Sequence, residues 1–386
     1  MEAMRRLLLL SCAIVLVDTM FYAAITPLLP HYVDELGLSK TGAGVLAGAY
    51  AAGTLLGALP GGLMAARVGV KRTVLFGLGC MVAASLAFAF GSSAGLLVAA
   101  RFVQGWGGAA SWAGALAWLI GRAPAERRGE YIGTALGAAI GGALFGPVLG
   151  GIGQALGPEP AFIGVACLAL ALALWASATP GIEPAGAGRL SDVRRSLRDH
   201  RVARGTWLIS MPGLLFGAIG VLGPLRLDAL GASGAVVAGT WLVAAGLEST
   251  VSPVVGRLSD RHGRLVPVFV ALALAPVFLL LLPAAQTVAF EAALIMLGAP
   301  VIGILWAPAS AMLSDGAEAV GLDQALGFAL LNLGWALGQV TGAAASGALA
   351  QATTDAVPYA ILVGVCLATL AVLVRGRRGA LASVPR

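Results

Sequence analysis

Three ionisable side chains fall inside otherwise apolar segments of this 386-residue chain: Asp18, Arg101 and Glu248. A charge at membrane depth is costly and usually faces a cavity or a partner, so each is a functional candidate. A buried carboxyl group such as that of Asp18 can load and release a proton near neutral pH, or pair with a cation. Arg101 keeps its proton and must find a carboxylate, a carbonyl oxygen or water. Structural hydrogen bonding to a neighbouring helix is the alternative role for Asp18 and Arg101.

Aromatic and amide side chains accompany these charges. Tyr22 shares a helical face with Asp18, and Asn332, Trp335 and Gln339 share one face of a later segment. Apolar walls with a few polar groups suit an amphiphilic substrate, and aromatic rings beside an acid suit a cation. Packing against lipid is the alternative for any single Trp. The predicted substrate and proton site comprises Asp18, Tyr22, Arg101, Gln104, Glu248, Trp306, Asn332 and Trp335.

The composition predicts that these residues are carried by membrane-spanning helices. Hydrophobic residues make up 59% of the chain and charged residues 11%, against about 25% charged residues in an ordinary soluble domain. With about 20 residues needed per span, the chain has room for a dozen. The predicted spans are 7–30, 42–65, 73–90, 95–120, 131–155, 160–179, 206–226, 235–256, 265–283, 287–313, 324–350 and 357–374.

A repeat with an offset of 194 residues divides these spans into two sets of six. Pro30, Asp34, Leu36-Gly37 and Trp112 recur as Pro224, Asp228, Leu230-Gly231 and Trp306. Repeats in the same order predict a parallel duplication with a central cavity between two six-helix units. We therefore expect an all-α membrane protein with units at 1–180 and 205–386, joined by a cytoplasmic linker at 181–204. Glu248 has no acidic counterpart, because the offset places Thr54 there.

The basic residues predict the orientation. All but three of the 24 Lys and Arg fall at the termini, in the linker or in loops on one side of the membrane; the exceptions are Lys40, Arg101 and Arg226. The positive-inside rule makes that side, with both termini, cytoplasmic. The net charge of +6 is then a topology signal and implies no nucleic-acid partner. Glu291 is expected to be a solvated acid at a helix start.

Two loops, one in each half, carry a similar arrangement of glycine and charged residues. The first contains Gly62, Arg67, Gly69 and Lys71, and the second contains Gly256, Asp260, Arg261, Gly263 and Arg264. Glycine permits positive φ and close approach in tight turns, and a carboxylate paired with Arg at a helix end can act as a latch. The first copy has Ala66 where an acid would stand, so a simple positively charged anchor is the alternative there.

These residues resemble the major facilitator superfamily along the whole chain. Gly61–Arg72 is similar to its loop signature G-x-L-x-D-R-x-G-R-K, and Arg101-Phe-Val-Gln104-Gly105-Trp-Gly107 is similar to R-x-x-Q-G-x-G. The stretch Gly142, Gly146, Pro147, Gly150 and Gly151 resembles the pattern of drug:proton antiporters, and Asp18–Pro30 resembles the first span of that branch. In this superfamily, spans 1, 4, 7 and 10 line the cavity. Small-xxx-small spacing would bring helices of the two halves together in one state, although ordinary close packing is equally compatible with it.

The predicted function is a secondary antiporter that exports a small amphiphilic or cationic compound in exchange for protons. The alternative is an importer or facilitator of a small polar metabolite on the same fold. An ATP-driven pump is not expected because no phosphate-binding GxxxxGK[ST] loop occurs, and the three His residues fall in predicted loops. We expect no cofactor or metal and no enzymatic activity. The partners are substrate, protons and lipid, and the chain is expected to be a monomer in a bacterial cytoplasmic membrane.

Overall fold

The structure is a computed structural model, and its described residues are 2–124, 127–182, 195–322 and 324–382. Within these ranges every regular element is a helix. The first set is α1 (Glu2–Leu36), α2 (Lys40–Arg67), α3 (Val70–Phe90), α4 (Ala94–Arg122), α5 (Arg128–Leu156) and α6 (Pro158–Ala178). The second set is α8 (His200–Ala229), α9 (Gly234–His262), α10 (Leu265–Leu281) with η2 (Leu282–Ala284), α11 (Val288–Gly303), α12 (Trp306–Ala319), α13 (Gln324–Ala352) and α14 (Ala356–Ala382).

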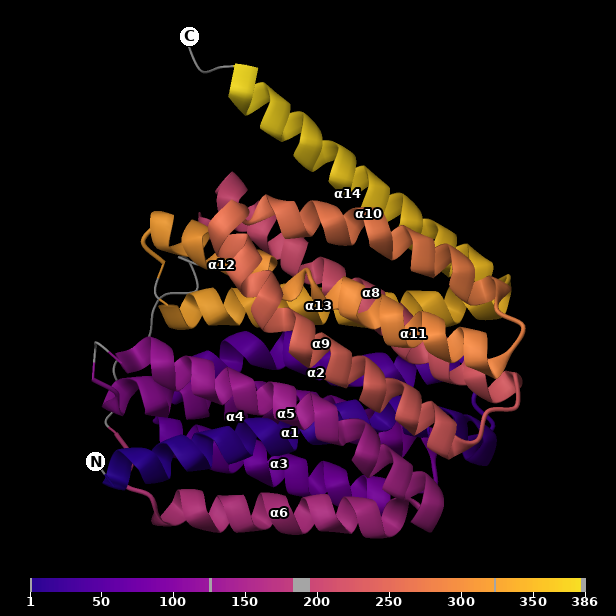
Figure 1. Ribbon diagram of the computed structural model, residues 1–386. Coiled ribbons are helices and arrows are strands. Elements are labelled where there is room, and N and C mark those ends of the chain that lie inside the picture. Colours follow the sequence, from indigo (N-terminus) through magenta and orange to yellow (C-terminus); the bar gives the residue numbers. More distant parts are fainter. Residues whose placement is uncertain (1, 125–126, 183–194, 323, 383–386) are drawn as a thin grey trace.

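The predicted all-α architecture of twelve helical spans is confirmed, with one span divided. Figure 1 shows α1–α6 lying together in the lower part and the second set above them. The predicted span 287–313 is split into α11 and α12 by a turn at Ile304 and Leu305. Pro308 has no N–H to donate to the Ile304 carbonyl oxygen, and its ring crowds that carbonyl, so the regular hydrogen-bond pattern fails at this turn. Helix α8 begins at His200, inside the predicted linker, and residues 183–194 of that linker lie outside the described residues.

Ten segments of the described chain are long and apolar enough to cross a membrane. The helices α4 and α13 do not meet this criterion, although each has 29 residues. Both pack among the spanning helices, α4 against α2 and α3, and α13 against α2 and α8. Arg101 and Gln104 lie on α4, and Asn332 and Gln339 lie on α13. The low hydropathy of these helices therefore reflects polar residues placed inside the bundle.

The sequence repeat is also visible in the backbone. Gly37 and Gly69 have φ values of 61° and 103°, and Gly231 and Gly263, each 194 residues later, have 87° and 91°. Side chains with a Cβ rarely adopt this region, so glycine is required at these turns. Gly62 behaves differently from our expectation, because it lies inside α2 and a Cβ there would meet nothing within 4 Å.

The two sets of helices meet mainly through α2 on α13 and α5 on α9. A Cβ on Gly44 of α2 would lie 2.5 Å from the Ala343 carbonyl oxygen of α13. The absence of a side chain at Gly44 therefore allows the two backbones to touch. We call the end of the bundle that holds Lys40 the Lys40 end, and the end that holds Arg67 and Arg264 the basic end.

We expected the small-residue face of α5 to join the two sets of helices, but it does not. Gly142, Gly146 and Gly150 lie directly against the α1 backbone and side chains, within the first set. Only Gly151, one position further round α5, faces the second set, where its nearest neighbour is Ala238 of α9. Helix α5 continues unbroken through Pro147. The glycine spacing thus fixes α1 against α5 rather than forming a separable contact.

Candidate functional site

Asp18 is enclosed by three helices of the first set. Its side chain on α1 is 1% exposed. The Tyr50 hydroxyl on α2 donates to Oδ2 at 2.9 Å, and Trp112 Nε1 on α4 donates to the same oxygen at 3.0 Å. The other oxygen, Oδ1, has no hydrogen-bond partner among the described residues. A Cβ on Gly108 would lie only 2.8 Å from Oδ1, so glycine leaves the room that this carboxyl group occupies.

Arg101 lies beside Asp18 without forming a direct ion pair with it. Its guanidinium donates to the Tyr22 carbonyl oxygen at 2.8 Å and to Gln104 Oε1 at 2.7 Å. It also lies 5.3 Å from the Tyr22 ring centroid and 5.0 Å from that of Tyr50. Arg101 is 2% exposed, and its buried charge is stabilised by these carbonyl, amide and ring contacts. Its charge still acts on Asp18 through space.

An aromatic cluster joins this site to the second set of helices. The Tyr22 ring centroid lies 4.7 Å from Tyr50 and 5.7 Å from Trp335 of α13, and Tyr50 lies 6.3 Å from Trp335. Tyr22 and Trp335 are partly exposed. Asn332, one turn before Trp335, is also partly exposed, whereas Gln339 is buried with Oε1 unpartnered in the described structure.

Glu248 forms a second acidic position in the other set. Its carboxyl group on α9 is hydrogen-bonded by the side chain of Trp306. A Cβ on Gly303 would lie 2.7 Å from the Glu248 carboxyl carbon, so the acid fits against the break between α11 and α12. Trp306 in turn stacks on Phe216 of α8, with centroids 6.4 Å apart. No cation in the described ranges forms an ion pair with Glu248.

All of the predicted site residues except Asn332 therefore fall into two groups, one around Asp18 and one around Glu248. Tyr22, Arg101, Gln104 and Trp335 belong to the first group. Trp306 belongs to the second. Sequence reasoning missed Tyr50, which touches Asp18, Arg101 and Trp335 together. Tyr50 lies among small residues of a predicted span, four residues before Thr54, and this position could have identified it as a candidate site residue.

The two repeated loops at the basic end differ in their contacts. In the second loop Arg264 Nε pairs with Asp315 at 2.8 Å, and Arg264 Nη1 lies 3.8 Å from Asp260. We expected Asp260 to pair with Arg261, but the structure gives Arg261 no ion pair within its described part. In the first loop Lys71 Nζ donates to the Ser177 carbonyl oxygen at 2.5 Å, and Arg67 is exposed. Only the second loop has the carboxylate pairing that a latch requires.

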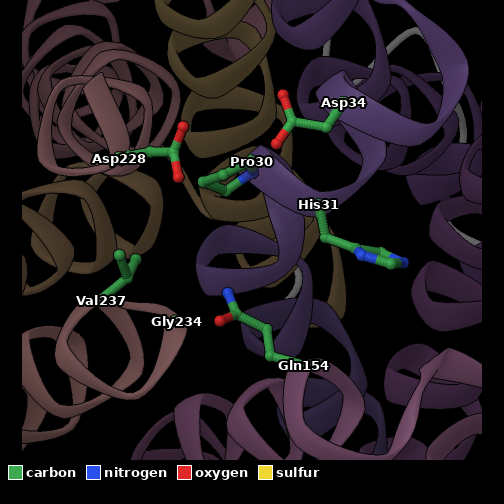
Figure 2. Close-up of a pocket in the computed structure, with 7 residues that line it drawn as sticks. All are labelled: Pro30, His31, Asp34, Gln154, Asp228, Gly234 and Val237. Carbon is green, nitrogen blue, oxygen red and sulfur yellow. The ribbon is translucent and has the colours of Figure 1, made fainter. Parts of the chain in front are cut away.

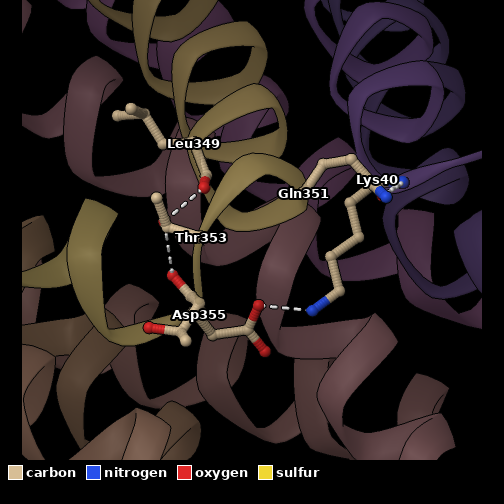
Figure 3. Close-up of polar contacts among 6 residues, drawn as sticks. Lys40, Leu349, Gln351, Thr353 and Asp355 are labelled. Carbon is tan, nitrogen blue, oxygen red and sulfur yellow. Dashed lines mark hydrogen bonds and ion pairs between the residues drawn. The ribbon is translucent and has the colours of Figure 1, made fainter.

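Two features at the Lys40 end were not predicted from the sequence. Lys40 Nζ pairs with Asp355 Oδ1 at 2.5 Å, and the Lys40 backbone N–H donates to Gln351 Oε1 at 3.1 Å, so α2 is tied to the second set (Figure 3). Asp34 and Asp228, which are repeat equivalents, line one hollow of about 150 Å³. Figure 2 shows their side chains at its edge. Lys40 and Asp355 lie at helix ends without a motif, so only the fold brings them together.

Comparison with known proteins places this geometry in a family. Residues 11–324 match the model described as Major Facilitator Superfamily. The chain belongs to this superfamily. It is therefore a multi-pass membrane protein in a family of transporters rather than enzymes. A probable vesicular acetylcholine transporter-B of Danio rerio is 34% identical over 181 residues, which cover 44% of this chain and 37% of that relative.

Solved structures support the fold independently. A bacterial homologue of the human lysosomal transporter Spinster, inward-facing and unoccupied, aligns with a TM-score of 0.75 over 96% of this chain and 95% of its own, at 14% identity. A POT family transporter bound to a thioalcohol-conjugated peptide gives 0.76 over 96% of both chains at 13% identity. A nucleoside transporter gives 0.75 over 96% and 99% at 13% identity. At these identities the similarity establishes the fold of this chain and leaves its substrate open.

Proposed function

We propose that this transporter is a proton-coupled antiporter that exports a small amphiphilic cation by alternating access. The enclosure of Asp18 is the observation that carries the proposal. A carboxyl group that is 1% exposed and has one unpartnered oxygen is expensive to maintain in a bilayer, which favours a functional role. Two donors stabilise its charged form, and burial stabilises its neutral form, so both protonation states are accessible.

The two acids are proposed to have different ligands. Trp112 contacts Asp18 and Trp306 contacts Glu248, and these tryptophans are repeat equivalents. Arg101 acts on Asp18 and would repel a cationic substrate there, whereas Glu248 forms no ion pair in the described chain. We therefore assign the exchanged proton to Asp18 and the positive charge of the substrate to Glu248. The name of the Danio rerio relative, a transporter of acetylcholine, is consistent with a cationic substrate.

Alternating access is proposed to occur between units at 1–180 and 205–386, with 181–204 as the connecting segment. The excess of Lys and Arg at the basic end makes this end cytoplasmic under the positive-inside rule. The Lys40–Asp355 pair would then close the external side, and Arg264 with Asp315 and Asp260 would act as a latch on the cytoplasmic side. The basic loops would also contact lipid phosphates. We propose that one chain is sufficient for transport.

The test is transport by the purified protein in liposomes with an imposed pH gradient. A panel of aromatic cations, matched neutral analogues and polar metabolites would be assayed for counterflow against protons. Asp18→Asn should abolish the response to the pH gradient while allowing passive exchange, because the amide fits the same space. Glu159→Gln, a change at an exposed acid, is the matched control and should leave transport unchanged. Gradient-driven transport by Asp18→Asn at the wild-type rate would refute the proton assignment.

A further inference from the structure

A second hollow lies at the basic end, inside the second set of helices. Its volume is about 430 Å³, and it lies between the starts of α8 and α10 and the end of α12. The charged and titratable side chains that line it are His200, Arg201, Arg204, Arg264 and Asp315. Arg264 and Asp315 belong to the proposed latch, whereas the α8 residues have no role in the proposed mechanism.

The charges around this hollow do not cancel. Arg264 Nε pairs with Asp315 Oδ2 at 2.8 Å and Arg264 Nη2 donates to Oδ1 at 3.3 Å, so this acid is committed to one arginine. Asp199 caps α8 by accepting from the Arg201 backbone N–H at 2.8 Å. The guanidinium groups of Arg201 and Arg204 are exposed and form no ion pair within the described chain. Each therefore has five N–H donors available for an anion.

The backbone that carries these arginines is held by close packing. A Cβ on Gly205 would lie 2.6 Å from the Leu313 Cα atom, and a Cβ on Gly316 would lie 3.1 Å from the Arg201 carbonyl carbon. The start of α8 is therefore packed directly against the end of α12. The starts of α8 and α10 both lie at the hollow, and the positive end of a helix dipole favours an anion. The hollow is thus preformed and electropositive.

The repeat shows that the fold does not require basic residues at this place. Leu7 and Leu10, which are 194 positions before Arg201 and Arg204, are 2% and 0% exposed. Val70, the equivalent of the third arginine, is 5% exposed. Apolar side chains therefore fill the corresponding place in the first set. The second set departs from this solution by placing arginines around a hollow, as expected for a binding site rather than a packing element.

The surroundings place the hollow at the level of lipid headgroups. Trp207 lies about one turn after Arg204 on α8 and is 48% exposed, and its indole N–H donates to Thr369 of α14 at 3.2 Å. Figure 1 shows α10 and α14 along the outer edge of the second set. Exposed tryptophans on the outside of a membrane protein gather at the boundary between lipid and water. Leu265 adds an apolar side chain to the wall of the hollow.

We propose that this hollow binds the phosphate group of an anionic membrane lipid, with Arg201 and Arg204 as the residues that contact the phosphate oxygens. Guanidinium groups match phosphate geometry with two parallel hydrogen bonds. Basic pockets between spanning helices on the cytoplasmic side bind anionic headgroups in the same way. A lipid without net charge brings an ammonium group that the arginines repel. The inference goes beyond the proposed antiport and does not depend on the roles of Asp18 and Glu248.

The test measures lipid binding to the complete 386-residue chain in a neutral detergent. Native mass spectrometry would follow a titration with dioctanoyl phosphatidylglycerol and give its Kd. Arg201→Gln combined with Arg204→Gln should raise this Kd about thirtyfold, because two basic contacts to a lipid phosphate are lost. Arg201→Lys combined with Arg204→Lys keeps both charges and should retain most of the binding. This second variant separates loss of charge from loss of the folded protein.

The matched control removes the same charge from the first set at the same end. Arg67→Gln combined with Arg72→Gln changes two exposed residues and should alter the Kd by less than about twofold. An equal loss in this control, or unchanged binding by the Arg201 and Arg204 variant, would overturn the proposal. Dioctanoyl phosphatidylcholine should bind at least about tenfold more weakly than phosphatidylglycerol. Inorganic phosphate at the same concentration should leave the lipid bound. Displacement by phosphate would assign the hollow to a soluble anion and refute the lipid assignment.

Discussion

Gly303 lies so close to the Glu248 carboxyl group that any side chain there would collide with it. Gly303→Ala should therefore displace Glu248 from Trp306 and lower kcat/KM for a cationic substrate by about tenfold, equivalent to about 1.4 kcal/mol. A neutral analogue should lose much less. Gly164→Ala, where a Cβ meets nothing within 4 Å, is the matched control. Equal losses for cationic and neutral compounds would show that Glu248 is not the site of the substrate charge.

The two donors on Asp18 predict the direction of a change in pH profile. Tyr50→Phe removes one donor to the charged carboxylate, at a cost of about 1.5–3 kcal/mol. The charged form is then less favourable, so the proton is released at higher pH and the transport profile should move upward in pH. The profile would be measured as initial rate against pH at equal inside and outside values. A downward shift would contradict the donor role of Tyr50.

The ion pairs of Arg264 predict a defect in turnover rather than in affinity. Arg264→Gln removes the pairing to Asp315 and Asp260 at the basic end, away from both acids of the site. We expect turnover to fall about tenfold while equilibrium substrate binding changes less than about twofold. Arg261 forms no ion pair within the described chain. Arg261→Gln is therefore the comparison, and it should have a smaller effect on turnover. A loss confined to affinity would remove the latch from the mechanism.

The proposed orientation predicts opposite labelling of the two ends. A Cys at Arg198 should be protected from membrane-impermeant reagents in intact cells, because the basic end faces the cytoplasm. A Cys at Thr354, exposed at the Lys40 end, should react. Permeabilised cells provide the control, since both positions should then be labelled. The reverse pattern would invert the topology and make Lys40–Asp355 an internal contact.

Much of the fold could be predicted because a membrane restricts this chain to helices. The lengths of these helices and the charges of their loops can be identified in the sequence. Asp18, Arg101 and Glu248 could be singled out because ionisable groups are rare in apolar segments. The partners of these residues could not be derived, since Tyr50 is as compatible with packing as with hydrogen bonding. Glu291 is 1% exposed rather than solvated, and it was misjudged because the sequence shows its place near a helix start. It does not show the neighbouring helices that cover it.

The glycine face of α5 illustrates the same limit. Its spacing shows that some helix approaches closely, but the identity of that helix is a tertiary property. The structure gives α1 as the partner of Gly142, Gly146 and Gly150. The positive φ values at Gly69 and Gly263, in contrast, follow from local chain geometry and could be predicted from the repeated loop motif.

The low hydropathy of α4 and α13 has a consequence for biogenesis. A segment that carries Arg101 and Gln104, or Asn332 and Gln339, enters lipid poorly by itself and needs helices already in place to accept its polar groups. For α13 those helices include α2, from the opposite end of the gene product, so completion of the second set must wait for the first. Gln104→Leu should then insert more efficiently, giving more protein in the membrane and less transport per molecule. A change at Gln104 that favours membrane insertion is therefore expected to lower the transport activity of the inserted protein.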